Sequence, residues 1–437
     1  MKNNPNEILP PGRPEAKYAP PGGSEATELP SAGAINYVTR VLSSPLEVSS
    51  ANWNALLAGQ SEPTPFMRHE YLAALHASGS ATPQTGWTAR FVTLWQGDVL
   101  HAACALYLKA HSYGEYVFDW AWANAYAEHG LAYYPKALVA APFTPVPGTR
   151  LLARDATARE ALVQALVRWC GAEELSSLHL LFAADDDVAA CESAGLMLRH
   201  TVQFHWTNQD YADFDGFLAS LSQEKRKKIR QERRKVAEAG VTFRWSRGAD
   251  ISPADWDFFY RCYERTYFEH GNAPYLSRDF FQRMADDLPE AWLLFVAERA
   301  GQPVATSLIA INDQRTMTTG TFGIKNGSEG LAGGTSAGGI AYGRYWGALE
   351  RVDCLHFEAC YYQPLQWCID HGFYRFEGGA QGEHKMARAL LPVKTTSAHW
   401  LAHPSFAHAV ERFLEREGAG IQSYMTHLEE RNPFRSG

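Results

Sequence analysis

The chain has 437 residues, a formal net charge of −8 at pH 7 and 46% hydrophobic residues. This length predicts two domains, because single hydrophobic cores stop growing beyond roughly 250–300 residues. The acidic balance excludes a protein that coats nucleic acid with its whole surface, although a local basic patch remains compatible with it.

The N-terminal segment and the cysteines bear on location. Residues 1–34 contain seven prolines among polar residues, a composition that predicts a disordered tail. No run of 18 apolar residues occurs, so we expect no integral membrane segment. Seven cysteines without a C-x-x-C pair indicate reduced thiols and not a disulfide framework. Together these features favour the cytoplasm.

The folded part shows the same order of elements twice. Each half has a predicted β-hairpin followed by a helix and a short apolar strand, which predicts a duplicated α/β unit with a mixed sheet. We expect an N-terminal domain at 35–203 and a C-terminal domain at 204–437, the latter with a Gly-rich insertion at 312–340. The hairpin strands are Phe91–Trp95 with Val99–Leu108, and Trp292–Glu298 with Val304–Ile311; the later elements are a helix at Ala158–Cys170 and strands at Leu178–Phe182 and Phe373–Glu377.

The second half opens with a strongly basic helix. Eight cations fall within 225–235, with Ser222 as a plausible N-cap and Gly240 as the stop before a strand at Val241–Trp245. Residues three or four apart share a helix face, so the cations form a stripe that suits phosphate, including that of RNA. A solvated helix neutralised by its own glutamates is the alternative.

The segment from Phe357 to Arg388 combines a helix, a strand and a polar loop. His371-Gly372 predicts the helix stop, and Gly378-Gly379 allows a tight turn after the strand. Four polar residues follow, and polar groups held after a strand end are common in ligand sites of α/β folds. The alternative is an ordinary surface turn. The polar residues are Gln381, Glu383, His384 and Lys385.

Two further patterns have competing interpretations. Glu115, Trp120 and Trp122 lie in an aromatic segment that suits a substrate wall, although alternate spacing also suits one core-facing side of a strand. Cys354, His356, Glu358 and Cys360 alternate but match no standard zinc spacing, so we predict no metal and assign these groups to packing or hydrogen bonding. We also expect no tightly bound cofactor.

Several motifs together resemble the FemAB-like branch of the GNAT acyltransferase superfamily, and more closely its group of peptidoglycan biosynthesis or recognition proteins. The resemblance covers nearly everything from Tyr37 to Leu428. It implies two tandem GNAT-like acyltransferase domains and transfer of an acyl or aminoacyl group, from a CoA thioester or an aminoacyl-tRNA, to an amine of a small molecule, peptide or cell-wall precursor. The motifs include HSYGEYVFDWAWANAY (111–126), YGRYWG (342–347), HFEACYYQ (356–363) and GAQGEHK (379–385).

Amine acylation requires a base for the amine proton, donors for an oxyanion and cations for an anionic substrate. We assign the catalytic role to His384, Glu383 and Glu358, and leave open which of them is the base. An amide near 379–382 or the Tyr361 hydroxyl could stabilise the oxyanion. The predicted substrate- and donor-binding residues are Lys225, Arg226, Arg230, Arg344, Tyr361, Gln381, Lys385, Arg388, Glu115, Trp120 and Trp122.

Two other functions remain compatible with the sequence. One is a non-catalytic protein that recognises peptidoglycan or a peptide through the GNAT-like cleft. The other is RNA binding through 225–235 as the purpose of the protein. Because no G-x-S-x-G elbow or cysteine-protease context is present, direct transfer is the expected mechanism if the protein is an enzyme.

Overall fold

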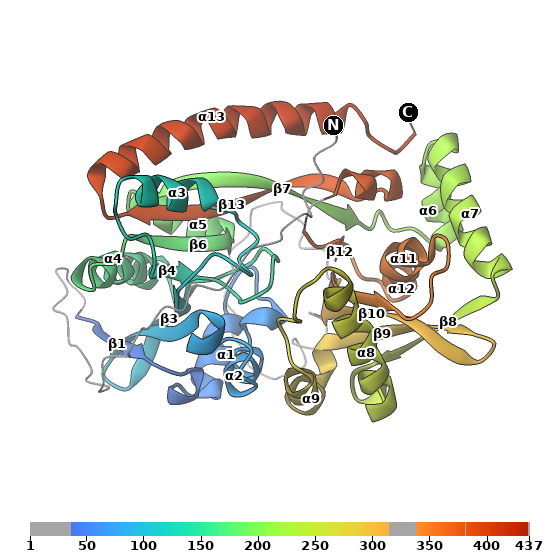
Figure 1. The fold of residues 1–437 in the computed structure, drawn as a ribbon, viewed down its shortest axis with the longest axis horizontal. Helices are drawn as coiled ribbons and strands as arrows, with labels where there is room; N and C mark the ends of the chain where they lie inside the picture. The colour runs from blue at the N-terminus through green and yellow to red at the C-terminus, as the bar shows by residue number, and fades with distance from the viewer. Residues whose placement is uncertain (1–35, 314–337, 381, 436–437) are drawn as a thin grey trace, which may run out of the picture.

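The computed structural model describes residues 36–313, 338–380 and 382–435. They form a mixed α/β fold built on one 13-stranded sheet (Figure 1). The predicted tail lies outside the described residues, as does most of the predicted insertion at 312–340. Within the described ranges, no helix is both long enough and apolar enough to cross a bilayer.

The sheet is continuous across both halves of the chain. Its strands are β1 (Val38–Leu42), β2 (Trp87–Gln96), β3 (Val99–Lys109), β4 (Lys136–Val139), β5 (Leu152–Ala153), β6 (Ser177–Ala183), β7 (Met197–Thr207), β8 (Val241–Arg247), β9 (Trp292–Arg299), β10 (Gln302–Asn312), β11 (Ile340–Ala348), β12 (Arg375–Glu377) and β13 (Leu391–Leu401). Their spatial order is β1-β2-β3-β4-β6-β13-β7-β12-β11-β10-β9-β8, with β5 paired to β3.

Helices cover both faces of this sheet. The predicted N-cap Ser222 precedes α7, but its side chain makes no cap hydrogen bond. Two other helices have side-chain caps: the Asp155 carboxylate accepts from the Ala158 N–H, and the Ser252 hydroxyl accepts from the Asp255 N–H. The helices are α1 (Ser50–Ala58), α2 (His69–Ala77), α3 (Trp120–Glu128), α4 (Ala156–Ala172), α5 (Asp185–Ser193), α6 (Phe214–Ser220), α7 (Gln223–Glu238), α8 (Pro253–Glu269), α9 (Arg278–Asp287), α11 (Leu355–Phe357), the π-helical η6 (Glu358–Tyr362), α12 (Gln363–Asp370) and α13 (Pro404–Glu429). Short 3-10 turns are η1 (Pro45–Glu47), η2 (Pro65–Met67), η3 (Pro83–Thr85), η4 (Gly248–Asp250), η5 (Pro289–Ala291) and η7 (Glu383–Arg388).

The predicted repeat is confirmed by the topology. From one edge, β1, β2, β3 and β4 are antiparallel and β4 then runs parallel to β6. From the other edge, β8, β9, β10 and β11 are antiparallel and β11 then runs parallel to β12. Each half therefore ends in one parallel pair, and the two pairs face the centre of the sheet.

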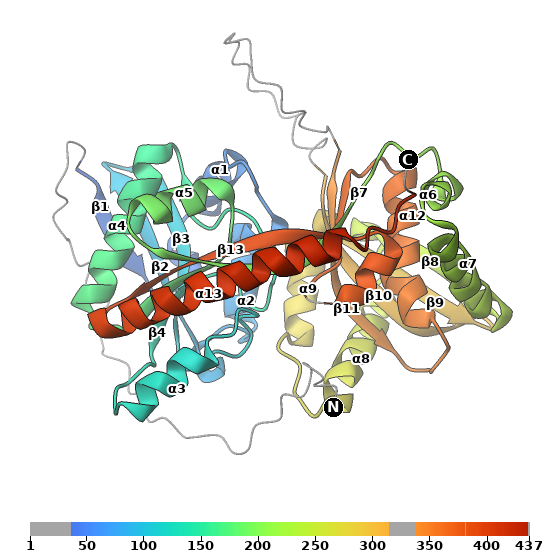
Figure 2. The ribbon, with the colours of Figure 1, turned by 90° about the horizontal axis from the view of Figure 1, so that it is seen from above.

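The two halves exchange their next strands. β7 follows β6 in the chain but pairs with β12 of the second half, whereas β13 follows β12 and pairs with β6 of the first half. β7 and β13 also pair with each other over nine residue pairs, from Leu391↔His205 to His399↔Met197. Helix α13 then lies along both exchanged strands (Figure 2). The predicted boundary at 203/204 falls inside β7.

A shared apolar core also joins the halves on one face of the sheet. Tyr71 of α2 packs edge to face on Phe280 of α9, with ring centroids 5.4 Å apart. Phe66 of η2 packs on Tyr342 of β11 at 5.5 Å. All four side chains are at most 1% exposed, so separating the halves would expose large aromatic surfaces.

The structure corrects one local interpretation. The alternate spacing around Trp120 and Trp122 suggested a strand face, but both residues lie in α3, which begins at Trp120. Asp119, with φ −118° and ψ 23°, breaks the extended backbone before this helix. Short aromatic runs do not by themselves separate helix from strand.

We predict that neither half folds when the chain is divided at 203/204. The cut severs β7 and leaves β6 without β13, so each fragment has unpaired strand edges and exposed core. Separate expression of 36–203 and 204–435 should give aggregated or non-cooperatively melting protein by circular dichroism, and coexpression should restore a soluble complex. A monomeric 36–203 fragment with a cooperative melt would contradict this.

Candidate active site

A gap opens where β11 and β12 diverge. These parallel strands pair only from Ile340↔Arg375 to Tyr342↔Glu377. β11 then continues to Ala348, while the chain after Glu377 turns away at Gly378 and Gly379. Diverging parallel strands leave unpaired backbone groups and space between them, which is a common setting for ligands in α/β folds.

A β-bulge lies at the start of this gap. Ile309 of β10 pairs with Gly343 and Leu308 pairs with Tyr345, so Arg344 is the extra residue on β11. A bulge leaves its extra residue outside the hydrogen-bond ladder and redirects the neighbouring side chains. Here it brings the Arg344 side chain into the gap.

The gap contains a pocket of about 220 Å³. Most of its wall comes from the second half, including β11, the turn after β12 and the helical segment α11–η6, and two residues come from the first half. The lining residues are Tyr116 and Pro145 of the first half, and Tyr267, Ser307, Gly343, Arg344, Tyr345, Trp346, His356, Cys360, Tyr361, Gly378, Gly379 and Ala380 of the second.

At the corresponding place in the first half, the protein's own chain lies against the end of β6. Gly148 forms a parallel bridge with Ala183 at the end of β6. The Arg150 guanidinium donates to the carbonyl oxygens of Leu181 at 3.1 Å and Gly148 at 3.2 Å, and Arg150 is 1% exposed. Of the two halves, the second therefore carries the candidate site.

Two histidines and a tyrosine provide proton-transfer groups. His356 and Tyr361 line the pocket with ring centroids 5.8 Å apart. The Tyr361 hydroxyl lies 3.2 Å from Nε2 of His384. Desolvation lowers the pKa of His356 to about 4 and also lowers the pKa of His384, so both imidazoles are neutral near pH 7. Burial raises the pKa of Tyr361, which keeps its hydroxyl a donor.

Lys385 supports the turn that forms one pocket wall. Its Nζ donates to the carbonyl oxygen of Gly379 at 3.0 Å and to that of Ala380. Burial lowers the pKa of Lys385 to about 8. A Cβ at Gly378 of the same turn would lie 2.5 Å from Cδ2 of Leu390, so a larger residue there would displace that side chain. Lys385, a predicted substrate-binding residue, thus holds in place a main-chain turn that lines the pocket.

Arg388 is held in a buried ion pair. Its Nη2 lies 2.8 Å from Oε2 of Glu232, and its guanidinium carbon lies 3.5 Å from the Phe357 ring centroid. Tyr362 also hydrogen-bonds to Glu232. This cluster ties α7, η6 and η7 together behind the pocket, so the predicted substrate-binding Arg388 has a positioning role in this structure.

Glu358 faces α7 instead of the pocket. Arg233 Nε donates to it at 3.1 Å and Gln363 Nε2 at 2.7 Å. It lines a separate open groove of about 700 Å³ together with Arg230. Arg230 pairs with Asp215 at 3.4 Å, so this groove has both positively and negatively charged side chains.

The other cations of α7 lie on its outer surface. Ile229 and Val236 bury the inner face of the helix, whereas Lys227, Lys228, Arg234 and Lys235 are exposed. The predicted Lys225 and Arg226 are partly exposed, and Lys225 pairs with Glu224 at 3.2 Å. The basic stripe is therefore available to a large anionic surface but does not enter the β11–β12 pocket.

Glu383 also points away from the pocket. It accepts from Tyr424 at 2.9 Å and from Arg431 at 2.7 Å, both on the C-terminal segment. The hydrogen bonds from Arg431 and Tyr424 lower its pKa. Because these contacts hold the carboxylate outside the pocket, it is not within reach of an amine bound there.

The predicted binding residues of the first half also lie outside the pocket. Glu115 is buried and pairs with Lys136 Nζ at 2.8 Å; burial raises its pKa to about 7. Trp122 packs on His399 at 5.0 Å beneath α3, and Trp120 packs on Tyr113. None of the three lines the pocket, but Glu115 anchors the loop that presents Tyr116.

The structure thus brings Arg344, Tyr361 and, through Tyr361, His384 together at one pocket. Gln381 lies outside the described residues. Sequence reasoning missed His356 as a site residue, although its position two residues before Glu358 in the HFEACYYQ motif was a usable signal. It also missed Tyr116, because nothing local indicates that the first half closes the pocket.

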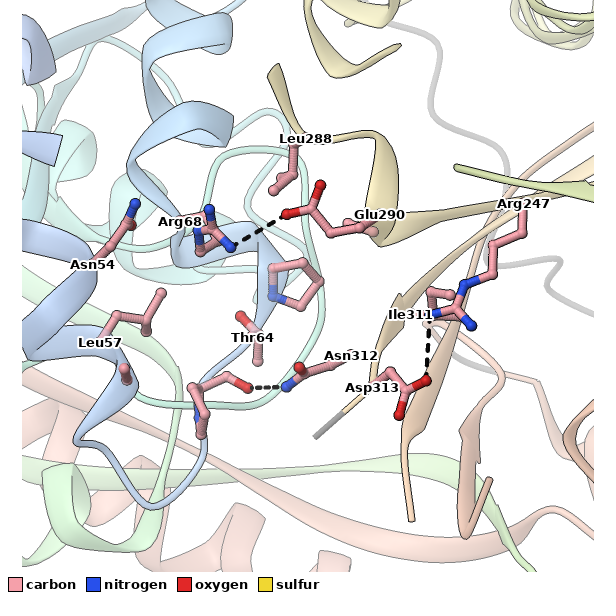
Figure 3. Close-up of a pocket in the computed structure, with 14 residues that line it drawn as sticks. Asn54, Leu57, Thr64, Arg68, Arg247, Leu288, Glu290, Ile311, Asn312 and Asp313 are labelled. Carbon is pink, nitrogen blue, oxygen red and sulfur yellow. Dashed lines mark hydrogen bonds and ion pairs between the residues drawn. The ribbon is translucent and has the colours of Figure 1, made fainter. Parts of the chain in front are cut away.

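A larger cavity of about 460 Å³ lies elsewhere between the halves (Figure 3). Its arginines have carboxylate partners: Arg68 lies 3.5 Å from Glu290 and Arg247 lies 3.3 Å from Asp313. Among the described residues that line it, there is no His, Cys or Tyr. Across the described ranges, no three His, Cys, Asp or Glu side chains are grouped as metal ligands.

The sequence profile of the FemAB-like family, described as peptidoglycan biosynthesis/recognition, matches residues 44–326 and 334–436. The chain therefore belongs to the FemAB-like family, and the resemblance read from its motifs is confirmed. The interruption at 327–333 falls within the predicted insertion. No curated protein sequence matches the chain.

Solved structures give distant likenesses. FemX has 11% identity and a TM-score of 0.47, covering 83% of this chain and 98% of that one. The C-terminal domain of a putative lysylphosphatidylglycerol synthetase from Agrobacterium fabrum has 9% identity and a TM-score of 0.49, covering 85% and 97%. A tandem GNAT protein from the clavulanic acid biosynthesis pathway has 12% identity and a TM-score of 0.39, covering 84% and 99%.

We predict that Arg388→Leu destabilises the protein by about 3–5 kcal/mol, because it leaves the Glu232 carboxylate buried without its cation. Arg431→Leu is the matched control: it breaks an ion pair whose side chains are 49% and 46% exposed, which should cost at most about 1 kcal/mol. Urea unfolding measures both. Equal losses for the two variants would refute the positioning role of Arg388.

Proposed function

We propose that the protein transfers an acyl or aminoacyl group directly to an amine in the β11–β12 pocket. The observation that carries this proposal is the divergence of β11 and β12 around a pocket that contains neutral His356 and the protonated Tyr361 hydroxyl. Membership in the FemAB-like family supports the same class of reaction.

Each group has a distinct part in this reaction. The neutral amine attacks the acyl carbonyl, and His356 then accepts the proton from the nitrogen of the tetrahedral intermediate, which is far more acidic than a free ammonium ion. The Tyr361 hydroxyl donates to the oxyanion of the tetrahedral intermediate, and His384 orients that hydroxyl from behind. The imidazolium of His356 gives this proton to the departing alcohol or thiol of the donor, so that an amide bond replaces the ester or thioester and His356 is neutral again.

Cys360 favours direct transfer over a covalent enzyme intermediate. Its thiol lines the pocket, where a nucleophilic cysteine could attack the donor. Burial raises its pKa to about 12, although a hydrogen bond with Ser307 opposes this rise. Since the thiolate is the reactive form, this cysteine is a poor nucleophile at neutral pH.

Transfer from CoA thioesters and charged tRNAs to candidate amines should be measured by mass spectrometry. His356→Ala should lower kcat/KM by about 10²–10⁴-fold through loss of the base, and Tyr361→Phe by about 10²–10³-fold through loss of the oxyanion donor. Glu383→Gln is the control and should retain nearly full activity. Ligand binding without transfer, unchanged in both pocket variants, would instead favour a recognition protein.

The exposed cations of α7 favour RNA as a second binding partner, whether as the tRNA of a donor or as an independent ligand. Replacing Lys227, Lys228, Arg234 and Lys235 by glutamine should weaken binding of a fluorescent RNA hairpin. The plot of log K against log salt concentration should also become less steep, by up to about three units of slope. The matched control replaces Arg412 and Arg416 of α13. Salt-insensitive binding, or equal effects of both sets, would exclude this role for α7.

A further inference from the structure

Arg344 enters the β11–β12 pocket as a cation without a counter-ion from the described residues. Its Nη2 donates to the Phe143 carbonyl oxygen at 2.8 Å and lies 3.5 Å from Thr144 Oγ1 and 3.4 Å from the Tyr345 hydroxyl. Its Nε is buried without a hydrogen-bond partner. The guanidinium therefore stacks on aromatic rings, with its carbon 5.2 Å from the Phe66 ring centroid. No carboxylate of the described residues neutralises its charge.

Several other largely buried arginines of this chain have carboxylate partners, and Arg150 instead donates to the carbonyl oxygens of Val146, Gly148 and Leu181. Arg159 lies 3.2 Å from Asp187, Arg375 lies 3.0 Å from Glu377, and Arg388 lies 2.8 Å from Glu232. By contrast, no residue that lines the Arg344 pocket is an Asp or Glu. Removing a guanidinium from water without an anion is costly, so the ligand is the natural source of the missing negative charge.

The surroundings favour a carboxylate over a phosphate dianion. Arg344 is the charged side chain of the lining, and its fork matches the two oxygens of a carboxylate. The rest of the wall is largely aromatic, with Tyr116, Tyr267 and Trp346 around a small volume of about 220 Å³. One cation in such a pocket balances one negative charge.

We propose that Arg344 binds a carboxylate of the acceptor, so that the acceptor is an amino acid or a peptide whose free carboxylate lies close to its reacting amine. This inference rests on the proposed transfer function and names its acceptor class. It also gives the first half a role in recognition, because the Phe143 carbonyl fixes the guanidinium and Tyr116, held at φ 63°, closes the pocket.

Binding in the absence of any acyl donor tests the inference. N-acetylalanine, its uncharged primary amide and inorganic phosphate are titrated into the full chain by calorimetry at low ionic strength. The acid should bind about tenfold or more tightly than the amide and phosphate. Arg344→Gln should abolish this preference, while Arg344→Lys should keep a weaker one because charge remains but the fork is lost.

Arg247→Gln is the matched control, since Arg247 lines the other cavity, and its affinities should stay within about twofold of wild type. Circular dichroism establishes that each variant is folded. Equal binding of acid and amide, tighter binding of phosphate, no binding of the acid at millimolar concentration, or an unchanged preference in Arg344→Gln would each overturn the inference. A carboxylate preference without any acyl transfer would instead refute the proposed function alone.

Discussion

The exchange of β7 and β13 is the constraint on which the rest of the molecule depends. Each strand leaves its own half and completes the sheet of the other, so the two repeats share one hydrogen-bond ladder and one apolar core. Strand edges that would otherwise be exposed are paired at the centre. The halves are thereby fixed relative to each other, which allows Tyr116 and Phe143 of the first half to shape a pocket in the second.

Each half has a parallel strand pair on the side that faces the centre of the sheet, but the space beside the pair is filled differently in the two halves. In the first half Arg150 turns inward and satisfies main-chain carbonyl groups, which closes the space after β4 and β6. In the second half the bulge at Arg344 and the glycines after β12 keep the corresponding space open. One repeat therefore serves as a structural partner and the other as the candidate catalytic unit.

The buried charges also differ in the partners that hold them. Arg388 with Glu232, and Lys136 with Glu115, are neutralised inside the protein and hold helices and loops in place. Arg344 is anchored by a carbonyl and aromatic rings but lacks a carboxylate among the described residues. Arg150 also lacks a carboxylate partner among the described residues, but the carbonyl oxygens of Val146, Gly148 and Leu181 accept from its guanidinium. Arg344 differs because it lines a pocket in which a ligand can reach it.

The sequence by itself determined several of the elements, the repeat and the family. Hydrophobic spacing and turn residues located the hairpins β2–β3 and β9–β10, the helices α4 and α7 and the strand β6, because these depend on local periodicity. It also indicated Arg344, Tyr361 and His384. Only the tertiary structure decided that Glu358 and Glu383 pair with Arg233 and Arg431, that Arg388 is a support, and that His356 and Tyr116 meet at the pocket. These outcomes depend on which faces the exchanged strands bring together, and contacts between residues far apart in the chain leave no mark in local spacing.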